Sequence, residues 1–586
     1  AGLAFNARYF DRHFLTEPDW QDWLAATRKL QESMTDELIE SAIKEYPEEI
    51  YQHHGEEIIK KLKARRERLH EYARTFYLAL AKEVNVLGSD KHEYFKVERL
   101  NDEETRIRVW KRKKDDGDLR HLMYDRTFKK SETKEVRLYG FDGQDVFELD
   151  GEVDKGIKIR IIGGKDDDEV NDESLVSGLF KKTIYYDKKN GKNGLGTKGE
   201  TKDMRSTRDD INYYNRKEFE YDLLAPAAYF GFNPDDGVFV GGGARIVTHG
   251  FRKEPYKSSH LIRANIAPKT NSYNLEYNGE FIDVFGRNDL LINLEVPTPS
   301  AVNFFYGSGN ETVNERDEQG NQYYRVRYFQ FLLESIIRRT WKDGKHDARL
   351  GISLQNIELE DEEEAPGDRF IYQYIEDFPE QVQADVFENP KTFTTLFANY
   401  TFDSRDSKMV PTRGVRFNTR ASNVSGTEVE DRDVVSFWRF TGDLSLYLST
   451  GQANSRFNTT WATRVGGAVI RGDYEEIYQS NFMGGFSNLR GYRRMRFAGQ
   501  RSFYWNNDLR IKLFNFRTYL LPGQFGIHGI YDIGRVWVDG ENSDKWHQGY
   551  GGGIWVTPFG AAVLSLDITT SEEEELLPFV RFGFMF

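Results

Sequence analysis

The C-terminal three-fifths of the chain consists of long segments in which apolar and polar residues alternate one by one. In "NDLRIKLF", residues 507–514, positions 509, 511 and 513 are apolar, whereas 508, 510 and 512 are charged. Segment 415–422, "VRFNTRAS", shows a similar split. A period of two is typical of a β-strand with one apolar face. A soluble sandwich of two sheets has the same alternation, so the period alone leaves two folds open.

The number of strands and the lengths of their connections separate the two folds. The pattern predicts sixteen strands, near 225–234, 238–250, 259–268, 273–284, 288–299, 323–340, 346–359, 392–405, 412–424, 434–450, 455–470, 503–514, 525–537, 547–558, 561–570 and 577–586. Many are long enough to cross a bilayer at a tilt of ~45°. Long connections (299–322, 359–391, 425–433, 471–502) alternate with short ones such as "GRN" and "WKDGK". This is typical of an outer-membrane barrel, so residues 221–586 are predicted to form a 16-stranded antiparallel transmembrane β-barrel.

The composition excludes several other classes of protein. The net charge of −14 argues against general nucleic-acid binding. The mean hydropathy is −0.68, and no run approaches the ~18 to 20 apolar residues of a membrane-spanning helix. Cysteine is absent, which excludes disulfides and thiolate metal sites. The chain starts with Ala1 and has no signal segment, so we expect a processed or truncated product.

The first 220 residues differ from the rest and divide into two regions. Residues 1–88 are predicted to be helical, with one long helix through 56–84 in which apolar residues recur at helical spacing. Residues 89–220 contain short strands and then a polar, glycine-bearing linker. The fold class is therefore mainly β, with a helical region and a small β-rich region ahead of the barrel.

Two turns in the β-rich region resemble calcium-binding β-roll turns. They are "YGFDGQDVF" (139–147) and "IIGGKDDDEV" (161–170), and their candidate ligands are Asp142, Asp145, Asp166 and Asp168. The first turn lacks the paired glycines of that motif, the second has Asp166 where a glycine belongs, and their spacing is not nine residues. Glycine-aspartate turns between strands are the simpler interpretation. We predict no cofactor and keep calcium as the alternative.

The stretch "GGFSNLRGYRRMRFAG", residues 484–499, lies in the sixth long-side connection of the predicted barrel. Its Leu-Arg-Gly-Tyr at 489–492 resembles the (V/I)-R-G-(F/Y) motif of the bacterial surface antigen superfamily, the BamA-like and TamA-like barrels. That family also has an acidic D-x-G on the thirteenth strand, and this sequence has Asp532 and Gly534 in "YDIG". The resemblance covers about residues 221–586, and Leu489 in place of Val or Ile is a departure from it.

The resemblance implies that this connection folds back into the barrel lumen, where Arg490 meets Asp532. A buried guanidinium needs a carboxylate that matches its fork of donors. Gly491 is then expected to allow a tight turn, and Tyr492 to pack on the inner wall. The alternative is that the arginines bind lipopolysaccharide phosphates outside the barrel, and for Arg493, Arg494 and Arg496 we leave it open.

The chain ends in "PFVRFGFMF", which places Phe582, Phe584 and Phe586 on one face of a strand with an aromatic residue as the last one. This ending predicts a closing strand whose aromatic face contacts lipid.

The resemblance to the surface antigen barrels implies assembly or translocation of proteins in the bacterial outer membrane, with the N-terminal region in the periplasm. The periplasmic POTRA repeats of that family are not recognisable in residues 1–220. This region instead resembles part of two-part proteins in which a metallophosphoesterase precedes a surface antigen barrel, so the alternative is a membrane anchor for upstream catalytic domains.

We expect no catalytic residues in this chain. The expected partners are outer-membrane lipids, lipopolysaccharide and other outer-membrane or periplasmic proteins, and not nucleic acid.

Overall fold

The computed structural model describes residues 5–114, 117–189, 192–197, 200–208, 210–233, 237–269, 272–297, 301–320, 322–359, 368–378, 391–426, 436–451, 455, 457–472, 477–518, 521–560 and 562–586. The chain divides into two compact units, residues 1–219 and 220–586. Each unit is described by itself below.

The first unit begins with five helices: α1 (Arg8–Phe14), α2 (Trp20–Ser33), α3 (Asp36–Lys44), α4 (Glu48–Glu67) and α5 (Leu69–Ala81). Asp19 caps α2 by accepting hydrogen bonds from the backbone N–H groups of Gln21 and Asp22. The predicted long helix is two helices separated at Arg68, and strand β1 (Glu83–Leu87) already lies inside the region predicted to be helical. Within the described residues, no helix combines the length and the apolar character needed to cross a membrane.

The rest of the first unit is a stack of parallel strands. One sheet holds β1, β5 (Glu135–Phe141), β8 (Lys158–Gly164), β11 (Thr183–Tyr186) and β13 (Thr201–Asp203). The second holds β2 (Glu93–Arg99), β6 (Val146–Asp150), β9 (Glu169–Asp172) and β12 (Gly194–Thr197), extended from β2 by the antiparallel β3 (Glu104–Arg112) and β4 (Leu119–Lys129). The short β7 (Glu152–Val153) and β10 (Leu175–Val176) also pair in parallel.

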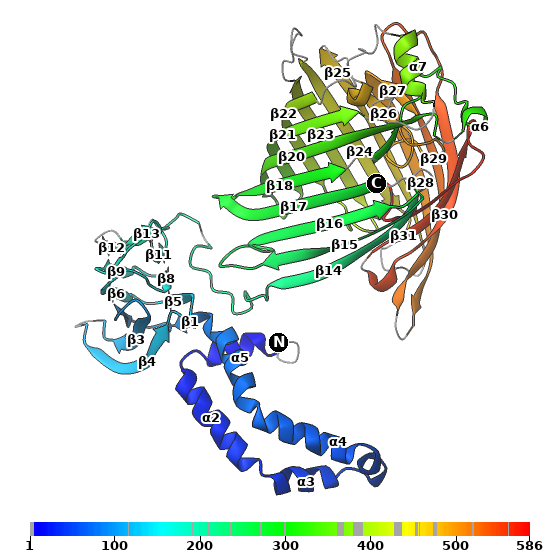
Figure 1. Ribbon diagram of the computed structural model, residues 1–586. Helices are drawn as coiled ribbons and strands as arrows, with labels where there is room; N and C mark the ends of the chain where they lie inside the picture. Colours follow the sequence, from blue (N-terminus) through cyan, green and yellow to red (C-terminus); the bar gives the residue numbers. More distant parts are fainter. Residues whose placement is uncertain are drawn as a thin grey trace. The chain divides into compact units, whose positions relative to one another are not determined.

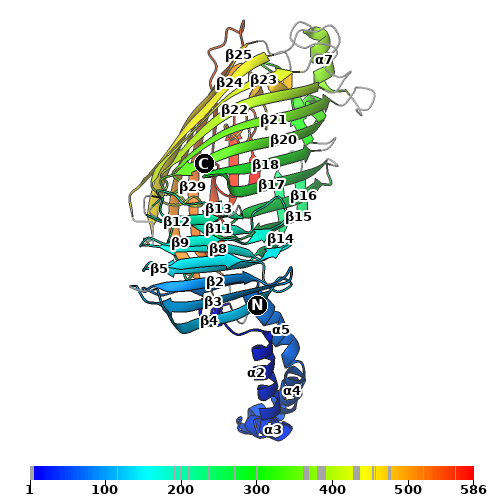
Figure 2. The ribbon, with the colours of Figure 1, turned by 90° about the vertical axis from the view of Figure 1, so that its left-hand side faces the viewer.

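These strands form the coils of a β-solenoid (Figure 2). Val136 pairs with Ile159 and Val146 with Glu169, so successive coils are offset by 23 residues. Each coil buries apolar side chains against the next, among them Val86, Leu138 and Ile161. The sequence did not reveal this repeat because the β3–β4 hairpin separates the first coil from the second.

The four candidate calcium ligands lie where these coils stack. Asp145 N–H donates to Asp168 Oδ1 (2.9 Å), and Asp168 N–H donates to Asn193 Oδ1 (2.8 Å). Asp166 accepts a hydrogen bond from Gly143 N–H, and Asp142 pairs with Lys165 (2.8 Å). In the part of the chain that is described, no group of three or more acidic or histidine side chains is arranged to hold a metal ion. Stacked turns therefore account for the contacts of these residues.

Two of these carboxyls lie almost completely buried. Burial, reinforced by the neighbouring Asp168, raises the pKa of Asp145 to about 9, and burial together with adjacent carboxylates raises the pKa of Asp168 to about 8. Both are therefore largely protonated at neutral pH. A protonated carboxyl resembles the amide of Asn193, which occupies the corresponding position in the next coil.

The second unit is a closed barrel of seventeen described strands (Figure 1). They are β14 (Leu223–Asn233), β15 (Gly237–Thr248), β16 (Ser258–Ala267), β17 (Ser272–Phe285), β18 (Asn288–Pro297), β19 (Ala301–Phe304), β20 (Arg325–Trp341), β21 (His346–Leu359), β22 (Lys391–Asp403), β23 (Gly414–Gly426), β24 (Ser436–Ser449), β25 (Asn458–Gly472), β28 (Arg501–Arg517), β29 (Pro522–Trp537), β30 (His547–Val556), β31 (Leu564–Ser571) and β32 (Leu577–Phe582). Because β18 and β19 pair with successive parts of β20, they count as one stave, and the predicted sixteen-stranded barrel is confirmed.

The alternation of side chains sets the two faces of the barrel wall. On β28, Leu509 is exposed, whereas Asp508 and Arg510 are buried. The apolar positions therefore face outward, as lipid requires, and the charged positions face inward. Two short helices, α6 (Arg316–Gln319) and α7 (Phe370–Asp377), lie in the long connections at one end of the barrel (Figure 1).

The C-terminus differs from the prediction. Strand β32 ends at Phe582, which is 67% exposed, and Gly583 has a positive φ of 93° that turns the chain. Phe586 is buried beside Tyr447, and its main-chain oxygen accepts a hydrogen bond from Arg510 Nη2 (2.9 Å). The Arg510 guanidinium also lies 4.0 Å from the centre of the Phe584 ring. The prediction of one lipid-facing aromatic face is therefore wrong, because Gly583 allows the chain to turn inward toward a buried cation.

The Asp145 and Asp168 pair predicts an unusual pH dependence. Because the folded chain holds these protons more tightly than the unfolded chain, the solenoid should lose stability as the pH rises from about 4 toward 8–9. Replacing both residues by asparagine should stabilise the solenoid at pH 8 by roughly 1–3 kcal/mol relative to the parent. Hydrogen exchange of residues 135–172, corrected for intrinsic rates and compared at pH 6 and pH 8, measures this. Asp142→Asn, at the surface, is the control, and equal protection in the parent and the double variant at pH 8 contradicts the prediction.

Candidate functional site

The sixth long connection, between β25 and β28, folds into a compact cluster, which we call the loop cluster (residues 477–500). It contains the short strands β26 (Asn481–Met483) and β27 (Phe497–Gly499), which pair with each other. Leu489 and Tyr492 are completely buried and pack with Met483, Phe497 and the β29 residue Val536. The apolar residues of the connection therefore anchor it against the barrel wall.

Arg490 lies at the centre of the loop cluster with no exposed surface. Its Nε and Nη2 donate to the two carboxylate oxygens of Asp532 on β29, at 2.7 and 2.6 Å. Its Nη1 donates to Asp508 Oδ1 on β28 (2.7 Å), and its backbone N–H also donates to Asp532 Oδ2 (2.9 Å). The structure thus brings Arg490 and Asp532 together, as the motif predicts, and adds a second carboxylate. Two carboxylates around one buried guanidinium satisfy its fork of donors and leave the pair with a net negative charge.

That negative charge is balanced by a second arginine on the same strand. Asp508 Oδ2 accepts hydrogen bonds from Arg510 Nε (3.2 Å) and Nη2 (2.8 Å), and Arg510 is 3% exposed. Arg510 also binds the main-chain oxygen of Phe586. A continuous series of charged contacts therefore links the loop cluster, through β28, to the C-terminal residue.

Neighbouring polar contacts hold the main chain beside Arg490. Asn506 of β28 donates to the carbonyl oxygen of Asn488 (2.7 Å) and accepts from Arg464 of β25 (2.8 and 3.0 Å). Arg464 also donates to the carbonyl oxygen of Ser487 (2.7 Å). The chain on the N-terminal side of Arg490 is therefore fixed by side chains of β25 and β28.

Three glycines permit the close approach of the connection to the wall. Gly491 has a positive φ of 95°, and a Cβ there would lie 2.5 Å from the carbonyl oxygen of Thr570. A Cβ at Gly549 on β30 would lie 1.7 Å from the carbonyl oxygen of Arg490. Gly534 leaves room for the sulfur of Met483, which would lie 2.7 Å from a Cβ at that position. The glycines of the two motifs therefore act by removing volume as well as by allowing a turn.

The remaining arginines of the loop cluster also pair within the protein. Arg493 donates to both carboxylate oxygens of Glu574 (2.8 and 3.3 Å), and Arg496 to both of Glu573 (2.6 and 2.9 Å). Arg494 donates to Asn303 Oδ1 (3.2 Å). Arg496 is only 1% exposed. The alternative that Arg493 and Arg496 bind lipopolysaccharide phosphates outside the barrel is therefore wrong, because their guanidinium groups are already matched by carboxylates.

The sequence did not identify Asp508, Glu573 and Glu574 as partners. Asp508 stands on a predicted polar face, but alternation does not say which residues of a distant connection reach it. The two glutamates belong to the acidic run "SEEEE" at 571–575, which is the only concentrated negative charge near the closing strand in the sequence and lies in a turn. A basic connection in the same barrel is the signal that could have paired them.

Replacing Arg490 by methionine should destabilise the barrel strongly. The change leaves Asp532 buried without its guanidinium, which is expected to cost roughly 3–5 kcal/mol. Arg501→Met removes a half-exposed arginine that pairs with the exposed Asp539, so it should cost less than about 1 kcal/mol. The temperature at which the folded band disappears in a gel-shift assay measures both. Adding Asp532→Asn to Arg490→Met should restore part of the loss, and equal transition temperatures for the two single variants refute the argument.

A second variant pair tests the position of the loop cluster without changing any charge. Gly549→Ala should displace Arg490 and Gly491 from β30, because the new methyl group overlaps the Arg490 carbonyl oxygen. Gly529→Ala, on the adjacent β29, meets no atom within 4 Å and serves as the control. Trypsin should cleave the arginine-rich connection faster in the first variant only. Equal cleavage of the two variants would show that the connection does not pack as described.

Known proteins share this architecture. Residues 259–585 match the Omp85 superfamily domain, which includes the loop cluster and both of its carboxylate strands. No curated protein sequence matches the chain. Similar solved structures include BamA from Haemophilus ducreyi lacking POTRA domains 1–3, at 11% identity and a TM-score of 0.43 over 62% of this chain and 70% of that one. They also include CdiB from Escherichia coli (13%, 0.39, over 62% and 63%) and CdiB from Acinetobacter baumannii (13%, 0.36, over 62% and 59%).

The chain spans less than two thirds of the length of either CdiB structure. The domain match covers more than half of this chain and confirms the resemblance to the surface antigen barrels. Barrels of this superfamily are generally not enzymes and reside in the bacterial outer membrane. The protein belongs to the Omp85 superfamily.

Proposed function

We propose that this barrel assembles or translocates other proteins in the bacterial outer membrane, and that it does so by opening between its first and last strands, β14 and β32. Membership of the Omp85 superfamily supports the general role. The observation that carries the proposal is the junction between these two strands.

The junction between β14 and β32 is the shortest in the barrel as described. The two strands share one residue pair, Phe232 with Val580, whereas β14 and β15 share eleven and β31 and β32 share six. The turn at Gly583 shortens β32 and so limits this pairing. Since each ladder hydrogen bond contributes to holding two strands together, this seam costs the least to separate.

The loop cluster supports a gated role over that of a passive pore. Its buried ion pairs and apolar contacts lie on the inward face of β28 and β29. Folded into the lumen, it acts in this proposal as an internal latch that blocks free passage of solutes.

The connectivity supports an orientation for the chain. Residue 220 leads into β14 at the end that carries the short connections, such as 342–345, and outer-membrane barrels place short turns in the periplasm. The first unit is therefore periplasmic in this proposal, and the long connections and lipopolysaccharide lie on the outer side. The second candidate is a membrane anchor for upstream phosphoesterase-like domains, which needs no movement of the seam.

A disulfide across the seam tests the proposal, because the natural chain has no cysteine to interfere. The pair Phe232→Cys and Val580→Cys joins β14 to β32. The control pair Leu224→Cys and Ile246→Cys joins β14 to β15, which need not separate. The measurement is the rate at which an unfolded outer-membrane barrel substrate folds in liposomes that contain each variant.

We expect the oxidised seam variant to lose at least tenfold of the parent's acceleration and to regain it on reduction. The control pair should keep the acceleration in both states. A seam variant that stays fully active when oxidised would rule out lateral opening. A parent that gives no acceleration would favour the anchoring role.

A further inference from the structure

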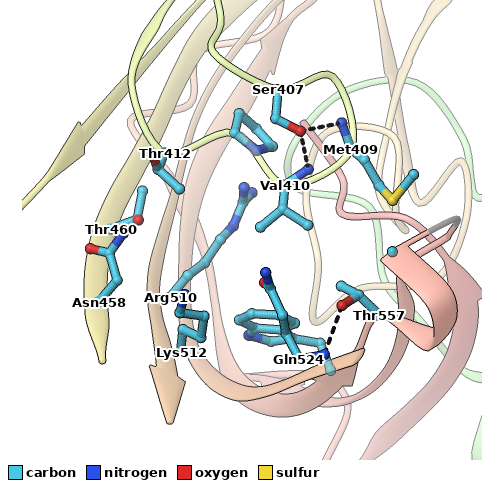
Figure 3. Close-up of a pocket in the computed structure, with 13 residues that line it drawn as sticks. Ser407, Met409, Val410, Thr412, Asn458, Thr460, Arg510, Lys512, Gln524 and Thr557 are labelled. Carbon is cyan, nitrogen blue, oxygen red and sulfur yellow. Dashed lines mark hydrogen bonds between the residues drawn. The ribbon is translucent and has the colours of Figure 1, made fainter. Parts of the chain in front are cut away.

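A cavity of about 250 Å³ lies inside the barrel at the end that carries the short connections (Figure 3). Its walls come from connection 404–413 between β22 and β23, from β25, β28 and β29, and from the end of β30. The residues that line it are Ser407, Met409, Val410, Pro411, Thr412, Asn458, Thr460, Arg510, Lys512, Gln524, Trp555, Thr557 and Gly560. The cavity lies apart from the loop cluster, although Arg510 reaches both.

The charge in this cavity has one sign. Arg510 and Lys512 are the charged residues among those that line it, and none of the described lining residues is an aspartate or a glutamate. The nearest carboxylate partner, Asp508, is shared, since its Oδ1 accepts from Arg490 and its Oδ2 from Arg510. One carboxylate thus serves two guanidinium groups, and the cavity itself is electropositive.

Arg510 offers an unused donor there. Its Nε and Nη2 are engaged by Asp508 and Phe586, but its buried Nη1 has no hydrogen-bond partner among the described residues. An unsatisfied donor in a buried group is costly, and it is more so when the group is charged. The side chain, 3% exposed, lies against the cavity, which is large enough to hold a ligand that supplies the missing acceptor.

The opposite wall is apolar. Met409, Val410 and Trp555 line it, and the turn that carries Met409 and Val410 is fixed by Ser407, whose Oγ accepts hydrogen bonds from both of their backbone N–H groups (3.2 and 3.1 Å). Gln524 is held in the same manner, because its backbone N–H donates to Thr557 Oγ1 (3.0 Å; Figure 3). The side chains of Gln524 and Thr460 extend the polar wall. The cavity therefore combines a rigid apolar side with a cationic side.

We propose that this cavity binds a small organic carboxylate with an aliphatic body, of about the size of one amino acid. A carboxylate accepts two parallel hydrogen bonds and so suits a guanidinium donor, with Lys512 adding a second positive charge. The aliphatic body packs against Val410 and Trp555, and Thr460 donates to the carboxylate. The volume equals roughly eight waters at ~30 Å³ each, which limits the ligand to this size. The site does not depend on whether the seam opens.

The test is isothermal titration of the whole purified protein in detergent micelles at low salt. The probes are N-acetyl-leucine, its neutral amide N-acetyl-leucinamide, and inorganic phosphate. We expect the carboxylate to bind at least tenfold more tightly than the amide, because only the carboxylate satisfies the Arg510 donor. It should also bind more tightly than phosphate, which lacks the aliphatic body. Equal affinity for the acid and its amide, or tighter binding of phosphate, overturns the proposal.

Variants locate the binding in this cavity. Lys512→Met should weaken N-acetyl-leucine at least tenfold, whereas Lys342→Met, which removes an exposed lysine from a short connection at the same end, should leave the affinity unchanged. Thr460→Val keeps the shape of the wall and removes one donor, so it should weaken binding about fivefold even if the lysine variant does not fold. Parent-like affinity in Thr460→Val and Lys512→Met means that the ligand binds elsewhere.

Discussion

The buried guanidinium of Arg490 is the interaction on which the loop cluster depends. Taking one arginine and two carboxylates out of water is expensive, and their mutual attraction repays that cost only when every donor is matched. The matching demands close contact, so Gly491 and Gly549 must lack side chains and Asn506 must hold the preceding turn. The cluster therefore contributes more to fixing where the connection lies than to net stability.

The sharing of Asp508 extends this constraint to the end of the chain. Arg510 is held on one side by that carboxylate and on another by the main chain of Phe586, so the last residues turn inward where a regular strand would continue outward. The inward turn at Gly583 ends β32 early, and a short β32 pairs with β14 at one position only. Charge balance in the lumen and the weakness of the seam thus share a cause.

Several of these features follow from the sequence, and others depend on three-dimensional register. The period of two predicts the sixteen staves and the polar face that carries Asp532, and the family motif predicts its partner Arg490. The second carboxylate, Asp508, is not predictable in this way, since alternation gives a face but not the depth at which a connection meets it. The inward C-terminus depends on one positive φ at Gly583. The solenoid repeat of 23 residues is hidden by an inserted hairpin.

The attachments of the loop cluster bear on how a seam and a latch coexist. Its ion pairs reach β28, β29 and the connection after β31, and the ring of Phe486 lies 3.9 Å from that of Phe579 on β32. These strands all lie on the C-terminal side of the seam. Separation of β14 from β32 would therefore leave the buried charges matched, and its cost would be confined to a few ladder hydrogen bonds and apolar contacts. A cluster that bridged the seam with buried ion pairs would instead hold the barrel closed, because each broken pair would strand a charge.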